Sequence, residues 1–204
     1  MEKKALRSTV KQQLSLLPQS SVLHQSAQIA QLLFQTREYQ AAKNVSVYVS
    51  KEGASEIATD EIIAHILASG RGCFIPRCVS RTKMEMVRLQ SLDDLASLPL
   101  NRMGIREPVL TEKRETMYEA GGADLIVMPL LAFDAQGWRI GHGAGYYDRF
   151  LEEVDAFNAA ASGQGEVKQT STIAIALREQ QVAGEIPRDK YDRKPGVILT
   201  AARE

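Results

Sequence analysis

The sequence has no apolar run long enough to span a membrane and no excess of charge of either sign. A membrane-spanning helix needs roughly 18 or more consecutive apolar residues, and no segment provides them. Lys plus Arg number 25 and Asp plus Glu number 25, so the formal net charge is zero. General binders of nucleic acid or membrane surfaces are usually basic. The sequence therefore predicts no nucleic-acid or membrane partner, although a local basic pocket is still allowed.

Cysteine is scarce, and the start of the sequence predicts no secretory leader. The two cysteines, Cys73 and Cys78, fall in one predicted strand with the wrong spacing for a C-x-x-C motif, and on a regular strand they face opposite sides. They are interpreted as reduced core thiols in a reducing compartment. The first seven residues lack the apolar core of a secretory signal. We therefore expect a cytoplasmic monomer, with the mitochondrion as the alternative because the start of the chain is basic and amphipathic.

The common metal and nucleotide signatures are missing as well. The three histidines, His24, His65 and His142, do not form a metal-binding set in the sequence. The dinucleotide fingerprint G-x-G-x-x-G fails because Tyr146 stands three residues after Gly143, and no P-loop Lys-Ser or Lys-Thr follows. The chain also has no motif for a catalytic serine or cysteine. Any nucleotide site must use a different glycine pattern.

What the chain does contain is a glycine-rich stretch at residues 137–151, G-W-R-I-G-H-G-A-G-Y-Y-D-R-F-L. An apolar segment precedes it and a helical pattern follows, an order that suits anion binding at a helix N-terminus. A plain tight turn explains the glycines equally well. Arg139 and Arg149 flank the loop and favour phosphate. Asp148 is consistent with Mg²⁺ between carboxylate and phosphate, or with an acid that the helix dipole stabilises.

Apolar, β-branched runs alternate with helical patterns along the chain. Strands are predicted at residues 44–50, 73–79, 84–89, 123–128, 170–177 and 196–200. Helices are predicted at 2–17, at 60–68 and after residue 145, with a surface insertion at 156–169. A further helix is predicted at 20–39, with Ser20 or Ser21 as cap and with Leu23, Ala27, Ala30 and Phe34 inward. Pro76 marks a strand edge or end. The pattern predicts an α/β fold, a single domain over residues 1–204 with three α/β/α layers and a mostly parallel or mixed sheet of Rossmann-like topology.

The region around the glycine loop resembles the signature of the 5-formyltetrahydrofolate cyclo-ligases, also called methenyltetrahydrofolate synthetases. That signature is approximately P-G-x-A-F-D-x-x-G-x-R-[LI]-G-x-G-x-G-Y-Y-D-R-x-L. Residues 129–151 read P-L-L-A-F-D-A-Q-G-W-R-I-G-H-G-A-G-Y-Y-D-R-F-L. The likeness extends over nearly the whole chain. Further family elements occur elsewhere in the chain. The pattern K-x-x-[LIM]-R appears at residues 4–7, shifted by one residue, and E-[VI]-x-T appears at 56–59. Apolar-Pro-basic appears at 75–77, G-I-x-E-P at 104–108, and the late acid of the family is Asp192.

The resemblance implies an ATP- and Mg²⁺-dependent enzyme that converts 5-formyltetrahydrofolate, with or without a polyglutamate tail, into 5,10-methenyltetrahydrofolate, ADP and phosphate. ATP phosphorylates the formyl oxygen, and N10 of the same folate then attacks as phosphate leaves. The protein supplies positioning and charge stabilisation rather than a nucleophile.

The resemblance also implies site residues. The expected catalytic residues are Tyr147 and Arg139, and the expected Mg²⁺ ligands are Asp148 and Asp192. The expected ATP contacts are Lys4, Arg7, Arg139, Gly141, His142, Gly143, Ala144, Gly145, Tyr146, Tyr147 and Asp148. The expected folate contacts are Val49, Glu56, Pro76, Met84 and Tyr147.

Each assignment has a plainer alternative. Lys4 and Arg7 could be a solvated flank of the first helix, Glu56 a helix-start acid, Asp192 a loop acid, and the apolar folate contacts part of the core. For the whole chain, the alternatives are a non-catalytic folate-, nucleotide- or nucleic-acid-binding relative, and a sugar-phosphate or acyl-CoA enzyme on a similar scaffold.

Overall fold

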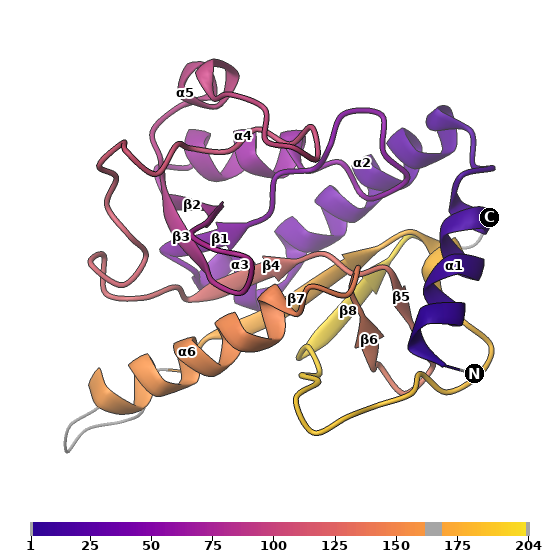
Figure 1. The fold of residues 1–204 in the computed structure, drawn as a ribbon. Coiled ribbons are helices and arrows are strands. Elements are labelled where there is room, and N and C mark those ends of the chain that lie inside the picture. Colours follow the sequence, from indigo (N-terminus) through magenta and orange to yellow (C-terminus); the bar gives the residue numbers. More distant parts are fainter. Residues whose placement is uncertain (1, 162–168, 203–204) are drawn as a thin grey trace.

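The computed structural model describes residues 2–161 and 169–202, and a six-stranded sheet forms its centre (Figure 1). The strands lie in the order β3-β2-β1-β4-β7-β8. All neighbours run parallel except β2 and β3, which form an antiparallel hairpin. Their bounds are β1 (Asn44–Val47), β2 (Gly72–Cys78), β3 (Met84–Leu89), β4 (Leu125–Met128), β7 (Ser171–Ala176) and β8 (Val197–Thr200). Each lies within, or within one residue of, a predicted strand.

Alternate residues of the strands face two separate cores, which is the physical basis of the layers. In β4, Leu125 and Val127 join one core while Ile126 and Met128 join the other. The first core also contains the apolar faces of α1 (Lys3–Leu14), α2 (Gln19–Gln35) and α4 (Asp60–Ala68), and the second contains that of α6 (Tyr146–Ala161). Figure 1 shows α2 and α4 on one side of the sheet and α6 on the other. The predicted three-layer α/β/α fold is confirmed.

The helices correct the prediction in three places. The helix predicted at 20–39 breaks at Thr36, whose side chain accepts a hydrogen bond from the Tyr39 N–H and starts α3 (Arg37–Ala41). Pro18 is at the N-cap of α2, so Ser20 and Ser21 are not caps. Of the residues predicted inward, Ala30 is buried and Phe34 is partly buried against the core, but Leu23 and Ala27 are exposed. At those two positions the stripe is displaced by one residue, and its members are Val22, Gln25, Ser26, Ile29, Ala30 and Leu33.

The predicted insertion at 156–169 is helical over its first part, since α6 continues to Ala161. Alanine is the best helix former and fills four of the positions from 156 to 161. Residues 162–168 lie outside the described part. Two short helices complete the described elements, α5 (Leu92–Ser97) and the 3₁₀ turn η1 (Arg178–Gln180). None of the helices in the described ranges is long and apolar enough to cross a membrane.

A small hairpin that the sequence analysis missed lies between β4 and the glycine loop. Its strands are β5 (Ala132–Phe133) and β6 (Arg139–Ile140). The buried Asp134 carboxylate fixes the turn by accepting N–H bonds from Gln136 at 3.0 Å and Trp138 at 2.9 Å. The sequence order is therefore strand, hairpin, glycine turn and helix, and the second hairpin strand aims Arg139 at the start of α6.

The strand order places a topological switch between β1 and β4. The chain leaves β1 toward β2 on one side, while β4 leads to β7 on the other. Ligands of open α/β sheets bind at such a point, beyond the carboxyl ends of the strands. Pro76 fits this geometry, because β1 pairs with β2 only as far as Phe74 whereas β3 pairs with it to Cys78. Pro76 thus lies where β2 has passed the end of its β1 partner and has entered the switch region.

Candidate active site

A cleft of about 960 Å³ opens at this switch point. A volume of this size accommodates a large cofactor-like ligand. The segments that line it come from the ends of β1, β2 and β4, from α1, from loops 51–56 and 101–107, from the glycine loop and from residues 189–192. Every residue predicted for the site lies on this lining except one. Those on it are Arg7, Val49, Glu56, Pro76, Met84, Arg139, Gly141, His142, Gly143, Ala144, Gly145, Tyr146, Tyr147, Asp148 and Asp192.

The exception is Lys4, which is exposed and is not among the residues that line the cleft. Lys3 takes its place: its Nζ donates to Asp192 at 2.5 Å and to Asp189 at 2.7 Å. Burial lowers the pKa of Lys3, but the hydrogen bonds and charges of the two aspartates raise it by more, so the ammonium group stays charged. Read from Lys3, the K-x-x-[LIM]-R pattern needs no shift. That unshifted reading is the signal that identifies the correct lysine.

The backbone conformation of the glycine loop requires glycine at positions 143 and 145 but not at position 141. Gly143 and Gly145 have φ values of +113° and +67°, which L side chains rarely adopt. The Arg7 guanidinium donates from Nε to the Gly141 carbonyl at 2.9 Å, which fixes α1 to the loop. At Gly141 the backbone is ordinary, and no described atom lies within 4 Å of an added Cβ. The protein itself gives no reason for glycine at that position.

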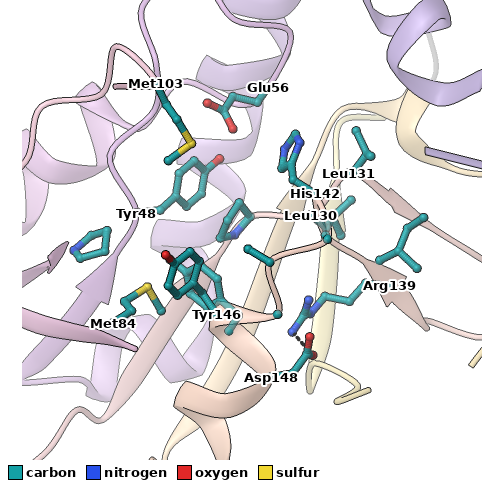
Figure 2. A pocket seen from close by; sticks show the side chains of 18 of the residues that line it. Tyr48, Glu56, Met84, Met103, Leu130, Leu131, Arg139, His142, Tyr146 and Asp148 are labelled. Atoms are coloured by element: carbon teal, nitrogen blue, oxygen red, sulfur yellow. Dashed lines mark hydrogen bonds and ion pairs between the residues drawn. The ribbon is translucent and has the colours of Figure 1, made fainter. Parts of the chain in front are cut away.

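Arg139 and Asp148 form an ion pair at the start of α6. Arg139 Nη2 donates to Asp148 Oδ1 at 2.9 Å, and the same oxygen accepts the backbone N–H of Arg193 at 3.2 Å (Figure 2). The Arg139 side chain is 3% exposed and that of Asp148 is 22% exposed. The Arg193 contact brings residue 192 and Asp148 to the same end of the cleft. Two ion pairs therefore lie at this end of the cleft, Asp148–Arg139 and Asp192–Lys3.

Two buried polar atoms of the lining lack a hydrogen-bond partner among the described residues. They are the Tyr147 hydroxyl and Arg139 Nε. An unsatisfied buried donor costs about 1–3 kcal/mol, so each such atom needs a reason. Burial raises the pKa of Tyr147 well above that of an ordinary tyrosine, so its hydroxyl keeps its proton. A ligand with acceptor atoms in the cleft would satisfy both donors.

The opposite end of the cleft is largely apolar and carries the Glu56 carboxylate. Figure 2 shows Glu56, Tyr48 and Met103 together there, with Arg139 and Asp148 at the far side. The Glu56 carboxylate accepts the Lys51 N–H at 3.0 Å. Burial raises the pKa of Glu56, against the opposing effects of that hydrogen bond and of the Lys51 charge. Val49, Pro76 and Met84 add apolar surface to the lining.

Two further side chains on the lining need separate comment. Burial, with the charges of Lys11 and Arg7, lowers the pKa of His142, which makes this imidazole neutral at pH 7. Arg149 was expected to clamp phosphate beside Arg139. Its guanidinium instead donates to the carbonyls of Thr82 at 2.7 Å and Ala144 at 2.5 Å, tying the loop to the β2–β3 turn.

Several lining residues were not predicted for the site, although the family element G-I-x-E-P at 104–108 includes three of them, Ile105, Arg106 and Glu107. They come from loops and strand ends that only folding brings together. Those most enclosed by the cleft walls are Tyr48, Leu130, Leu131 and Gln180, and those in loop 101–107 are Asn101, Met103, Ile105, Arg106 and Glu107.

The donor set at the charged end fits Mg²⁺ only in company with phosphate. Among the described residues, no group of three or more His, Cys, Asp or Glu side chains could hold a metal ion by itself. Asp148 and Asp192 provide two carboxylates in one region, each already neutralised by a cation. Mg²⁺ in nucleotide sites takes one or two carboxylates plus phosphate oxygens and water. The arrangement fits that composition.

Comparison with known proteins agrees with the signature of the glycine loop. The model of the 5-formyltetrahydrofolate cyclo-ligase family matches residues 1–201. This chain belongs to that family. The 5-formyltetrahydrofolate cyclo-ligase of Mus musculus is 35% identical over 198 residues, which cover 97% of this chain and 92% of the mouse protein. The resemblance inferred from the sequence is confirmed, and membership identifies the chain as an enzyme.

Solved structures support the fold. The NMR structure of 5,10-methenyltetrahydrofolate synthetase from Aquifex aeolicus matches with a TM-score of 0.72 at 24% identity, covering 97% of this chain and 89% of that chain. A 5,10-methenyltetrahydrofolate synthetase from Mycoplasma pneumoniae matches with a TM-score of 0.70 at 20% identity, covering 99% and 100%. At these identities the likeness shows the α/β architecture of the cyclo-ligase family.

Proposed function

We propose that this protein cyclises 5-formyltetrahydrofolate to 5,10-methenyltetrahydrofolate, consuming ATP and releasing ADP and phosphate. The observation that carries the proposal is the two-ended cleft: a cationic, glycine-lined end adjoins a largely apolar end that carries Glu56, and Tyr147 lines the same cavity. The family match over residues 1–201 supports the same reaction. The competing idea of a non-catalytic relative has less support, because the cations and acids of the charged end are present.

The chemistry requires positioning and charge rather than a protein nucleophile. A formyl group on nitrogen is a poor electrophile, and its oxygen is a poor leaving group until it carries a phosphoryl group. Arg139, Arg7 and Lys3 line the end where the ATP phosphates would lie and would stabilise the charge on the transferring phosphoryl group. The Tyr147 hydroxyl would donate to the formyl oxygen or phosphate, satisfying its buried donor. Exclusion of water from the cleft by the bound folate would strengthen both the charge stabilisation and the Tyr147 hydrogen bond.

Magnesium would be held by Asp148 and Asp192 together with phosphate oxygens, and would supply neutralising charge to the phosphates. Arg139 and Lys3, which neutralise these acids in the structure, would then face phosphate. Glu56, whose carboxylate matches the N–H groups of a pterin edge, would orient the folate at the other end. Val49, Pro76 and Met84 would form apolar walls of that pocket. The single-domain, monomeric and cytoplasmic assignments stay predictions.

The direct test is to mix the protein with 5-formyltetrahydrofolate and MgATP and to follow the near-ultraviolet absorbance of the methenyl product. We expect product to form only when ATP is present, with one ADP per product. Folded protein that binds both ligands but forms no product would support the non-catalytic alternative instead.

A substitution at Gly141 tests whether the glycine loop binds the ATP phosphates, without disturbing the fold. An added methyl at Gly141 meets no described atom within 4 Å, so Gly141→Ala should unfold at the wild-type denaturant concentration or slightly above it. Because the loop backbone must come close to the phosphates, we expect the KM for ATP to rise about tenfold, or ~1.4 kcal/mol. Gly184→Ala is the matched control, since that site is equally open and lies outside the lining. An unchanged KM for ATP in Gly141→Ala would place the nucleotide elsewhere.

Glu56 predicts a pH dependence of folate binding. Burial raises its pKa, so the carboxylate gains its proton at a higher pH than an ordinary glutamate does as the solution is acidified. Since the charged form accepts the pterin N–H bonds, the KM for 5-formyltetrahydrofolate should rise as pH falls through that raised pKa. In Glu56→Gln the KM for 5-formyltetrahydrofolate should be higher at neutral pH, and it should no longer rise as the pH falls through that range. Glu52→Gln, at an exposed site in the same loop, should keep the wild-type profile.

A further inference from the structure

The loop at residues 101–107 forms one wall of the cleft, although none of the roles proposed above uses it. Met103 and Ile105 are its apolar contributions to the lining. Figure 2 places Met103 next to Tyr48 and Glu56, at the end assigned to the folate and away from Arg139 and Asp148. The shape of this wall therefore affects one of the two substrates only.

An asparagine organises the inside of the loop. The Asn101 side-chain oxygen accepts the N–H groups of Met103 at 2.9 Å and Ile105 at 3.1 Å. The Asn101 backbone N–H donates to the Ile105 carbonyl at 2.8 Å, and Gly104 provides the positive φ of +77° at the turn. These bonds fix the direction of the two apolar side chains as long as the Asn101 amide itself is held in place.

Glu107 holds that amide and joins the loop to the sheet. One carboxylate oxygen accepts the Asn101 side-chain N–H at 2.6 Å, and the other accepts the backbone N–H of Cys78 at the end of β2. Burial, and then the nearby Glu107 charge, raises the pKa of Cys78 to about 11. Both Glu107 oxygens accept hydrogen bonds from the protein, so the carboxylate braces the loop and the strand end at once.

The far side of the loop touches the segment that carries Glu56. An added Cβ at Gly104 would lie 3.2 Å from Lys51 Cε, and the Lys51 N–H donates to the Glu56 carboxylate at 3.0 Å. Hydrogen bonds thus run from the end of β2 through Glu107 and Asn101 to the loop tip, which lies near Lys51 and so near the segment that carries Glu56. Without Glu107, the loop would lose its attachment to β2 and its internal bracing together.

We propose that Glu107 is a positioning residue for the folate, which fixes loop 101–105 against the end of β2 and so preshapes the wall formed by Met103 and Ile105. This inference rests on the proposed function, in which the Glu56 end takes the folate. A loop that must be ordered at each binding event weakens the ligand that it touches. Arg139 and Asp148, which the proposed function assigns to ATP, lie on the opposite side of the cleft from Met103 and Glu56.

The test uses the full chain and compares Glu107→Ala, Glu107→Gln, Asn101→Ala and the double variant Glu107→Ala/Asn101→Ala. We expect Glu107→Ala to raise the KM for 5-formyltetrahydrofolate about tenfold, or ~1.4 kcal/mol, while the KM for MgATP changes by less than about twofold. Glu107→Gln should have an intermediate effect, because its single carbonyl keeps one of the two bonds. The double variant should be no worse than the worse single variant, since both residues belong to one contact chain.

Hydrogen exchange supplies a readout that does not depend on turnover. In Glu107→Ala the amides of Met103 and Ile105 should exchange faster, whereas those of α6 should not change. Glu115→Gln, which affects an exposed ion pair with Arg88 outside the lining, should leave exchange and both KM values unchanged.

Equal rises in both KM values, an unchanged folate KM, or additive effects in the double variant would overturn the inference while the proposed function stands. Wild-type protein without turnover would instead overturn the proposed function, and the role of Glu107 with it.

Discussion

Replacement of Arg139 by methionine should lower kcat/KM for ATP-dependent turnover by a factor on the order of 10³, the scale of losing a principal electrostatic donor in phosphoryl transfer. Arg139 is the most enclosed cation of the charged end, with a side chain that is 3% exposed. It pairs with Asp148, and its Nε has no partner among the described residues. The change removes positive charge at the phosphates and leaves the Asp148 carboxylate without its cation. Both changes weaken the stabilisation of charge during phosphoryl transfer.

Two companion variants separate catalysis from folding in this experiment. Arg139→Lys keeps the charge but loses the fork of N–H donors, so it should recover ATP binding better than rate. Arg193→Ala is the matched control, because the Arg193 side chain pairs with the exposed Asp155 while only its backbone N–H reaches Asp148. We expect that control to change turnover by less than about twofold, as surface pairs contribute little. If Arg139→Met is folded and keeps more than a tenth of wild-type activity, the assigned role is wrong.

Asp148→Asn should change ATP binding in opposite directions with and without Mg²⁺. Without the metal, the carboxylate repels phosphate and occupies Arg139. Its neutral replacement should therefore bind free ATP about tenfold more tightly, or ~1.4 kcal/mol. With the metal, one of two carboxylate ligands is lost, so MgATP should bind more weakly and turnover should fall by a factor on the order of 10². Titration calorimetry with ATP in the presence of EDTA, and then of Mg²⁺, measures the two directions separately.

The control for Asp148 lies on the same helix. Asp155 is exposed, pairs with Arg193 and is absent from the cleft lining, so Asp155→Asn should leave ATP binding unchanged with and without Mg²⁺. Weaker binding of metal-free ATP by Asp148→Asn would mean that this carboxylate does not face the phosphates. Unchanged Mg²⁺ dependence would contradict its assignment as a metal ligand.

Most of the secondary structure could be predicted because its causes are local. The β-branched runs around Val45 and Ile126 and the helical apolar period of α1 and α4 depend on residues only one to four positions apart. The burial stripe of α2 was predicted one residue out of place at Leu23 and Ala27. Each residue turns a helix by about 100°, so the facing of a stripe depends on the sheet against which the helix packs. The β5–β6 hairpin was missed because each strand has two residues, too few to show a period.

The sequence by itself determined the glycine loop, its arginine and aspartate, and the family to which they point. Those residues lie within one short stretch, so their order and spacing can be read directly from the sequence. The sequence also carried the signal for Lys3, because K-x-x-[LIM]-R fits from that residue without a shift. Only the tertiary structure decided that Arg149 binds backbone carbonyls and that Glu107 joins its loop to the end of β2. These outcomes depend on how helices and loops far apart in the chain are oriented when they pack. No local pattern encodes such contacts, because their partners meet only at the switch point of the folded sheet.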